Sequence, residues 1–252
     1  TSFSTSRLIK MLENNETKKR TIAATILGNK TDQNAIVPLC SSLKKEKALY
    51  SRIAISEALG KMGEPAVGPV ADLLGIIGNN QETELPQKYF NKKSYPLARD
   101  IVARTLIKIG KPATPYLINL LDGEKDVFVK QQAIDALGGI VAKTKDQIAL
   151  KIIIGHFDTY GEGSKKRDKL TLWKIIRALS AFKNSKEASE VLLKFINNCQ
   201  DPPLVWESAR SLGQIGFKSN EIMVKLSILK ENDNEEIKKA AINALIALEN
   251  DL

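Results

Sequence analysis

The tripeptide Ala58-Leu59-Gly60 returns as Ala136-Leu137-Gly138, and with serine in the first place as Ser211-Leu212-Gly213. Its leucine recurs in one setting, with small or branched residues three and four places before it, at Leu27, Leu59, Leu106, Leu137, Leu179, Leu212 and Leu245. The successive intervals are 32, 47, 31, 42, 33 and 33 residues. A period in the thirties is typical of stacked repeat proteins, in which each unit buries its apolar face against its neighbours.

Each repeat is predicted to hold two helices, A and B, and the recurring leucine lies on helix B. At about 100° per residue, the positions seven, four and three before the leucine share its face. Pro65 and Pro112 stand where a helix would begin, as prolines at helix starts often do. The A helices are expected at Ala35–Ser42, Pro65–Ile77, Pro112–Leu121, Gln147–Ile154, Glu187–Asn197 and Ile222–Leu229.

The stretches Ala58–Ala66 and Ile109–Ala113, and the spaced pattern from Asp126 to Gly138, resemble the HEAT-like repeat of the phycobilisome-lyase type. The resemblance covers about residues 16–250. It implies an all-α fold, an α-solenoid or superhelix of about seven HEAT-like helix pairs in one array. The expected repeats are about 7–30, 31–63, 64–110, 111–144, 145–183, 184–217 and 218–252. Because this repeat occurs in many unrelated proteins, the resemblance predicts fold and not function.

Charge and composition narrow the class of partner. The 252 residues carry a formal net charge of +9, which favours an acidic partner. Cys40 and Cys199 fall in different repeats and are expected to be buried free thiols, as in a reducing, cytoplasmic compartment. One histidine and two separate cysteines predict no structural zinc site. Neither a membrane span nor a signal peptide is predicted. Because the sequence starts at Thr1 rather than Met, it leaves open whether a segment precedes Thr1 in the native chain.

Two intervals are longer than the others and place insertions at Gly78–Tyr95 and Gly155–Asp168. Longer loops in a solenoid often lie on a functional face, although surface loops also drift in length at little cost. Both insertions mix aromatic with basic residues, and the expected partner contacts there are Lys88, Tyr89, Phe90, Lys165, Lys166 and Arg167. With a local net charge of only +1 each, a solvated loop is the alternative interpretation.

The chain's two tryptophans fall six places before the leucine in successive repeats, each with an arginine one turn later. The pairs are Trp173 with Arg177 and Trp206 with Arg210, and Arg104 and Asp135 share the arginines' position in earlier repeats. The B helices of HEAT-type stacks line the concave face, where Trp and Arg would form a binding patch. In the alternative, both indoles cover a neighbouring repeat, each under its own arginine as a local cation–π pair.

Catalytic motifs are not predicted. The recurring acidic residue eleven places before the leucine, as at Asp126, caps helix B. His156 and Asp158 lack a partnered nucleophile, and no phosphate-binding glycine loop is present.

The function predicted from the sequence is therefore a non-enzymatic scaffold that binds an acidic protein or peptide without a cofactor. Trp206→Ala is expected to weaken binding and leave the fold intact. Two alternatives stay open. One is nucleic-acid binding, at the extreme as a relative of the alkylpurine DNA glycosylases, for which Asp135, Arg177 and Trp206 would be the matching residues. The other is a bilin lyase-like or chaperone role, which only the name of the repeat implies.

Overall fold

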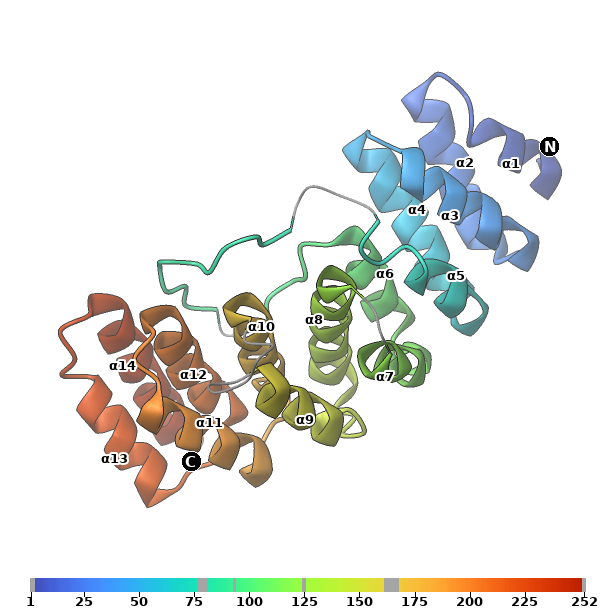
Figure 1. The fold of residues 1–252 in the computed structure, drawn as a ribbon. Coiled ribbons are helices and arrows are strands. Elements are labelled where there is room, and N and C mark those ends of the chain that lie inside the picture. Colours follow the sequence, from blue (N-terminus) through green and yellow to red (C-terminus); the bar gives the residue numbers. More distant parts are fainter. Residues whose placement is uncertain (1–2, 77–80, 93, 124–125, 161–167, 251–252) are drawn as a thin grey trace. The chain divides into compact units, whose positions relative to one another are not determined.

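All regular secondary structure in the described part of the chain is helical (Figure 1). The computed structural model describes residues 3–76, 81–92, 94–123, 126–160 and 168–250. The A helices are α1 (Thr5–Met11), α3 (Ile36–Lys45), α5 (Val67–Ala71), α7 (Thr114–Asp122), α9 (Leu150–Tyr160), α11 (Lys186–Asn198) and α13 (Asn220–Leu229). The B helices are α2 (Thr17–Lys30), α4 (Leu49–Met62), α6 (Ile101–Ile109), α8 (Val127–Thr144), α10 (Lys169–Leu179), α12 (Pro202–Ile215) and α14 (Glu235–Asn250).

The fold is an α-solenoid, and its contacts divide the chain into two compact units. The first consists of Thr1–Gln81 and Leu97–Ala136, and the second of Glu82–Pro96 and Leu137–Leu252. Inside each unit B helices stack on one another, α2 on α4 on α6 and α10 on α12 on α14, while each packs on its own A helix. A single array across both units remains a prediction from the repeats.

The recurring leucine forms the core of both units. Six of the seven leucines are fully buried, and only Leu245 in the last helix, α14, is half-buried. Both cysteines are buried thiols outside any disulfide, as the sequence predicted. No helix in the described residues is long and apolar enough to cross a membrane.

The glycine that follows the leucine lies where neighbouring B helices touch. A Cβ atom placed on Gly28 would lie 2.6 Å from the Cα of Ala58, and one on Gly213 would lie 2.6 Å from the Cα of Ala244. In both pairs the alanine directly precedes the recurring leucine of the next repeat. The Leu-Gly and Ala-Leu dipeptides of the repeat are thus two sides of one contact, at which helix backbones meet without side chains between them.

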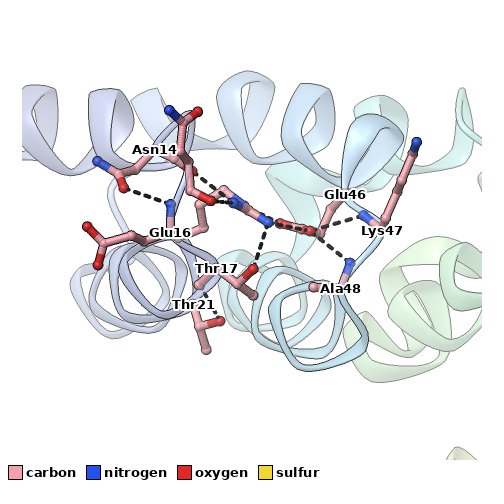
Figure 2. Close-up of polar contacts among 9 residues, drawn as sticks. Asn14, Glu16, Thr17, Thr21, Glu46, Lys47 and Ala48 are labelled. Carbon is pink, nitrogen blue, oxygen red and sulfur yellow. Dashed lines mark hydrogen bonds and ion pairs between the residues drawn. The ribbon is translucent and has the colours of Figure 1, made fainter.

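A partly buried ion pair ties the first helix pair to the second (Figure 2). The Arg20 guanidinium of α2 donates to both oxygens of Glu46, with Nε–Oε2 2.7 Å and Nη2–Oε1 2.9 Å, and its Nη1 donates to the backbone oxygens of Asn14 and Asn15. Glu46 also accepts from the backbone N–H groups of Lys47 and Ala48. One arginine therefore joins the α1–α2 turn to the α3–α4 turn.

This clamp predicts a loss of stability in acid. Hydrogen bonds from Arg20 lower the pKa of Glu46 from 4.5 to about 2. Because the folded pKa lies below the unfolded one, the stabilisation is complete above about pH 4.5 and is lost as the pH falls towards 2. After allowance for screening at this partly exposed site, we expect Glu46→Gln to lower the free energy of unfolding by about 1–2 kcal/mol at pH 7 and by much less near pH 2.

Urea denaturation at pH 7 and at low pH, followed by circular dichroism, measures this effect. Glu16→Gln is the matched control, since Glu16 is exposed and pairs with Lys19, three residues further along the chain. Equal losses in the two variants at pH 7 would contradict the role of the clamp.

The second expected insertion is partly helical. Helix α9 continues to Tyr160, so Gly155–Tyr160 forms a helical turn rather than a loop, and the His156 ring stacks on that of Tyr160. Lys165, Lys166 and Arg167 lie outside the described residues, so their expected partner contacts stay a prediction. The first insertion matches expectation more closely, because residues 82–92 and 94–96 form neither helix nor strand.

Candidate functional site

The tryptophan–arginine patch predicted from the sequence is closed. Trp173 and Trp206 are 1% and 0% exposed, and Arg177 and Arg210 are each 4% exposed. The expectation that both indoles emerge on an open surface is therefore wrong. Helices α10 and α12 bring these side chains together as the repeat spacing predicted, with the two indole rings edge to face at 6.5 Å between centroids. The structure differs from the prediction because other residues cover the face of α10 and α12 that holds these side chains.

The cover consists of residues Glu82–Pro96, most of which belong to the first insertion, Gly78–Tyr95, and these residues are called the covering segment. Its Tyr89 and Phe90 rings meet Trp206 edge-on, with centroids 5.8 Å and 5.7 Å away and interplanar angles of 76° and 77°. Edge-to-face pairs of this kind stabilise beyond the area that they bury. The two loop aromatics that the sequence singled out thus contact the very tryptophan that was expected to bind a partner.

The covering segment begins with a carboxylate held by two buried cations of α10. Glu82 Oε2 lies 3.0 Å from Lys174 Nζ, and Glu82 Oε1 lies 3.6 Å from Arg177 Nη1. Lys174 is 1% exposed and the Glu82 side chain 10%. Sequence reasoning missed both residues. The available signal was a lysine amid the largely apolar residues of helix α10, where a buried charge needs a partner.

Further contacts carry the covering segment over α14 and back to α8. The backbone N–H of Tyr89 donates to Glu236 Oε2 at 2.7 Å, and the Asn91 amide donates to the Asn243 oxygen at 3.2 Å. The Gln214 amide donates to the carbonyl oxygen of Lys92. Tyr95 lies on Gly138, where any Cβ would overlap its phenol. Figure 1 shows this blue-green stretch running along the helices of the second unit.

The two arginines behave differently from each other. Arg177 lies over the Trp173 ring at 4.3 Å, which is the local cation–π pair expected in the alternative interpretation. Arg210 instead lies over Phe90 of the covering segment at 5.3 Å. Its Nε and Nη2 both donate to Glu207, a buried carboxylate one turn earlier on α12. Only the first pair therefore has the expected geometry.

Several polar atoms beneath the covering segment lack a hydrogen-bond partner among the described residues. They are Trp173 Nε1, Trp206 Nε1, Glu207 Oε2 and Arg210 Nη1, and each is buried. A buried polar atom without a partner costs about 1–3 kcal/mol. The covering segment therefore fills the face sterically but leaves these four atoms without a hydrogen-bond partner among the described residues.

The other described residues proposed from the sequence are Arg104, Asp135 and Lys88. Arg104 on α6 donates to the backbone oxygen of Ala98, and Asp135 on α8 is buried. Both belong to the first unit, whereas the tryptophans belong to the second. Near Asp135, burial raises the pKa of the Asp100 carboxyl to about 6. Lys88 is exposed on the covering segment.

A shallow cavity of about 340 Å³ opens beside the covering segment on α12 and α14. Its lining includes Lys92, Lys183, Asn243 and Asn250, and it has no acidic residue. Among the described residues, no group of three or more His, Cys, Asp or Glu side chains could hold a metal ion.

No protein-family model matches this chain, and no curated protein matches it. The chain is similar to a designed armadillo repeat protein, at 17% identity over 97% of this chain and 100% of that one, with a TM-score of 0.45. A second designed armadillo repeat protein, in complex with the peptide (KR)4, is 16% identical to this chain. The match covers 98% of this chain and 100% of that one, also with a TM-score of 0.45. A chain in the complex of CpcE and CpcF of phycocyanin lyase from Nostoc sp. PCC7120 is 19% identical to this chain. The match covers 98% of this chain and 96% of that one, with a TM-score of 0.39. Since these TM-scores lie below 0.5, the fold assignment rests on the chain's own helices.

Proposed function

We propose that this protein is a non-enzymatic scaffold that binds an extended stretch of a partner protein on the face formed by α10, α12 and α14. One observation carries the proposal. The covering segment is an extended polypeptide without regular structure, and that face already holds it. A surface that holds one such chain has the shape and the anchors to hold another.

The anchors are those expected of a peptide-binding surface. Trp206 offers its ring to two neighbouring aromatic side chains, and buried Lys174 and Arg177 hold a carboxylate seven residues earlier in the segment. Side-chain groups of Gln214 and Glu236 bind the segment's backbone. Aromatic and arginine anchors in desolvated positions dominate the energetics of protein interfaces, and backbone contacts suit an extended ligand.

The finer assignments belong to the same proposal. We assign the repeats to the HEAT-like type of the phycobilisome lyases on the residues 58–66, 109–113 and 126–138. We also propose that binding needs neither a cofactor nor catalysis, and that the partner is a protein rather than nucleic acid. The edge-to-face aromatic contacts and the bonds to the segment's backbone support a polypeptide ligand.

Removal of the covering segment should open the face to a peptide in solution. The Gln81 amide donates to the Asp100 carboxylate at 2.9 Å, so the residues that flank the covering segment in the sequence lie close together in the first unit. A short Gly-Ser linker can therefore replace residues 82–96. We expect a synthetic peptide with the sequence of residues 82–96 to bind this variant in a calorimetric titration. The full chain should bind it at least 100-fold more weakly, because a tethered segment competes at millimolar effective concentration.

Two controls accompany this titration. Circular dichroism reports whether the variant keeps its helices, and a peptide with alanine at the two positions of Tyr89 and Phe90 should bind at least tenfold more weakly. A folded variant that binds neither peptide would refute the scaffold proposal.

A further inference from the structure

The side chains of Trp173, Lys174, Arg177, Trp206, Glu207 and Arg210 lie under the covering segment and are called the floor. The floor offers more hydrogen-bond donors than the segment uses. Three of its unpartnered atoms are donors, namely Trp173 Nε1, Trp206 Nε1 and Arg210 Nη1. Because Nε and Nη2 of Arg210 both point to Glu207, its free Nη1 lies on the opposite edge of the planar guanidinium. Phe90, the side chain that covers this guanidinium, has no acceptor atom to offer.

The charges of the buried side chains also favour a ligand that carries hydrogen-bond acceptors. Among the described residues, α10 and α12 bury three cations beneath the segment, Lys174, Arg177 and Arg210, and one anion, Glu207. Glu82 of the segment compensates one further positive charge. The buried cations of α10 and α12 thus outnumber the buried anions of these two helices, and a ligand with additional carboxylates would complement them.

Many side chains of the covering segment also face solvent. Its Thr83, Glu84, Gln87, Lys88, Asn91 and Lys92 are exposed, and Tyr89 and Phe90 are only half-buried. Its principal anchors are one carboxylate and two rings. A competing peptide that supplies the same anchors and more acceptors can take its place without any rearrangement of the helices.

We infer that the partner is an acidic, extended peptide that displaces the covering segment, with one carboxylate on Lys174 and Arg177 and further oxygen acceptors at Trp206 Nε1 and Arg210 Nη1. This inference rests on the proposed scaffold function and adds the partner's chemistry and its regulation. The segment is an internal occupant that keeps the face closed until an acidic partner competes for it. The affinity of the segment for the floor sets the concentration of partner that is needed to displace it.

The test uses the full chain and follows the segment directly. The two native thiols are buried, so a cysteine placed at exposed Gln87 can be labelled selectively with a fluorophore. Both tryptophans of the chain lie in the floor and act as energy donors to that label. Energy transfer is therefore high while the segment covers the face and falls when the segment leaves.

Two peptides of equal length serve as probes. Both have the sequence of residues 82–92; in the acidic probe both lysines are replaced by glutamate, and in the basic probe both glutamates are replaced by lysine. We expect the acidic probe to lower energy transfer in a saturable manner and the basic probe to leave it unchanged. Equal effects of the two probes would overturn the inference.

Glu82→Gln and Glu84→Gln are a matched pair of variants in the labelled chain. Both remove one negative charge from the segment, but only Glu82 contacts the floor, whereas Glu84 is exposed. We expect Glu82→Gln to lower the half-maximal concentration of the acidic probe about tenfold, and Glu84→Gln to change it less than twofold. Equal shifts in the two variants would mean that the segment is not held by this ion pair, and would overturn the inference.

The outcome separates the two proposals. If the variant with the Gly-Ser linker binds the acidic probe but the labelled full chain never releases its segment, the displacement inference fails and the scaffold function stands. If the folded linker variant binds no peptide, the scaffold function itself fails.

Discussion

Replacement of Trp206 by alanine is expected to lower the free energy of unfolding of the second unit by about 3–5 kcal/mol, the range for large aromatic side chains deleted from a packed core. The indole is 0% exposed and contacts the rings of Tyr89, Phe90 and Trp173. Its loss would leave a cavity that the covering segment and two helices share. Urea denaturation followed by the fluorescence of the remaining Trp173 measures the change.

This expectation reverses the one drawn from the sequence, under which Trp206→Ala leaves the fold intact. Trp206→Phe is the control, since it keeps an aromatic ring and removes the indole N–H that has no partner; we expect a loss of about 1–2 kcal/mol because most of the packed volume remains. If Trp206→Ala leaves the midpoint of urea denaturation unchanged, the indole ring does not lie in the core that the structure shows.

Replacement of Gly213 by leucine is expected to destabilise the second unit by about 3 kcal/mol or more, at the upper end of the range for overpacked cores. A Cβ on Gly213 would lie 2.6 Å from the Cα and 2.8 Å from the Cβ of Ala244 on α14. Because backbone and not a flexible side chain occupies that space, α12 and α14 must move apart. Denaturation followed by the fluorescence of both tryptophans reports the effect.

Gly155→Ala provides the contrast. Gly155 lies inside helix α9 and is exposed, and a Cβ there meets nothing within 4 Å. Alanine in a helix interior is favoured over glycine by about 0.5–1 kcal/mol, so this variant should be slightly more stable than the parent. A Gly213→Leu variant as stable as the parent would contradict the close approach of α12 and α14.

The amino-acid sequence was sufficient to predict the helices and much of their packing. The recurring leucine and its small neighbours marked the buried face of each B helix, because a helix presents the same face every three to four residues. The expected A helices agree with the observed ones to within a few residues, apart from α5, which ends six residues early, and α9, which continues six residues further. The Leu-Gly pattern was visible too, although only the structure shows that Gly213 meets Ala244.

The state of the candidate site was beyond the reach of repeat patterns. Spacing placed Trp173 and Trp206 correctly at one repeat position, yet it could not show that the covering segment lies on them. Glu82 and Lys174 are 92 residues apart, and Tyr89 and Glu236 are 147 apart. The insertion has no periodicity of its own, so nothing in its sequence specifies which surface it will contact.

The sequence by itself determined that the chain is a stack of helix pairs with aliphatic cores, because local periodicity dictates which side of each helix avoids water. Only the tertiary structure decided that the tryptophan face is closed. That outcome depends on one carboxylate and two aromatic rings reaching partners far along the chain, and contacts of this kind arise only once the helices have brought those partners together.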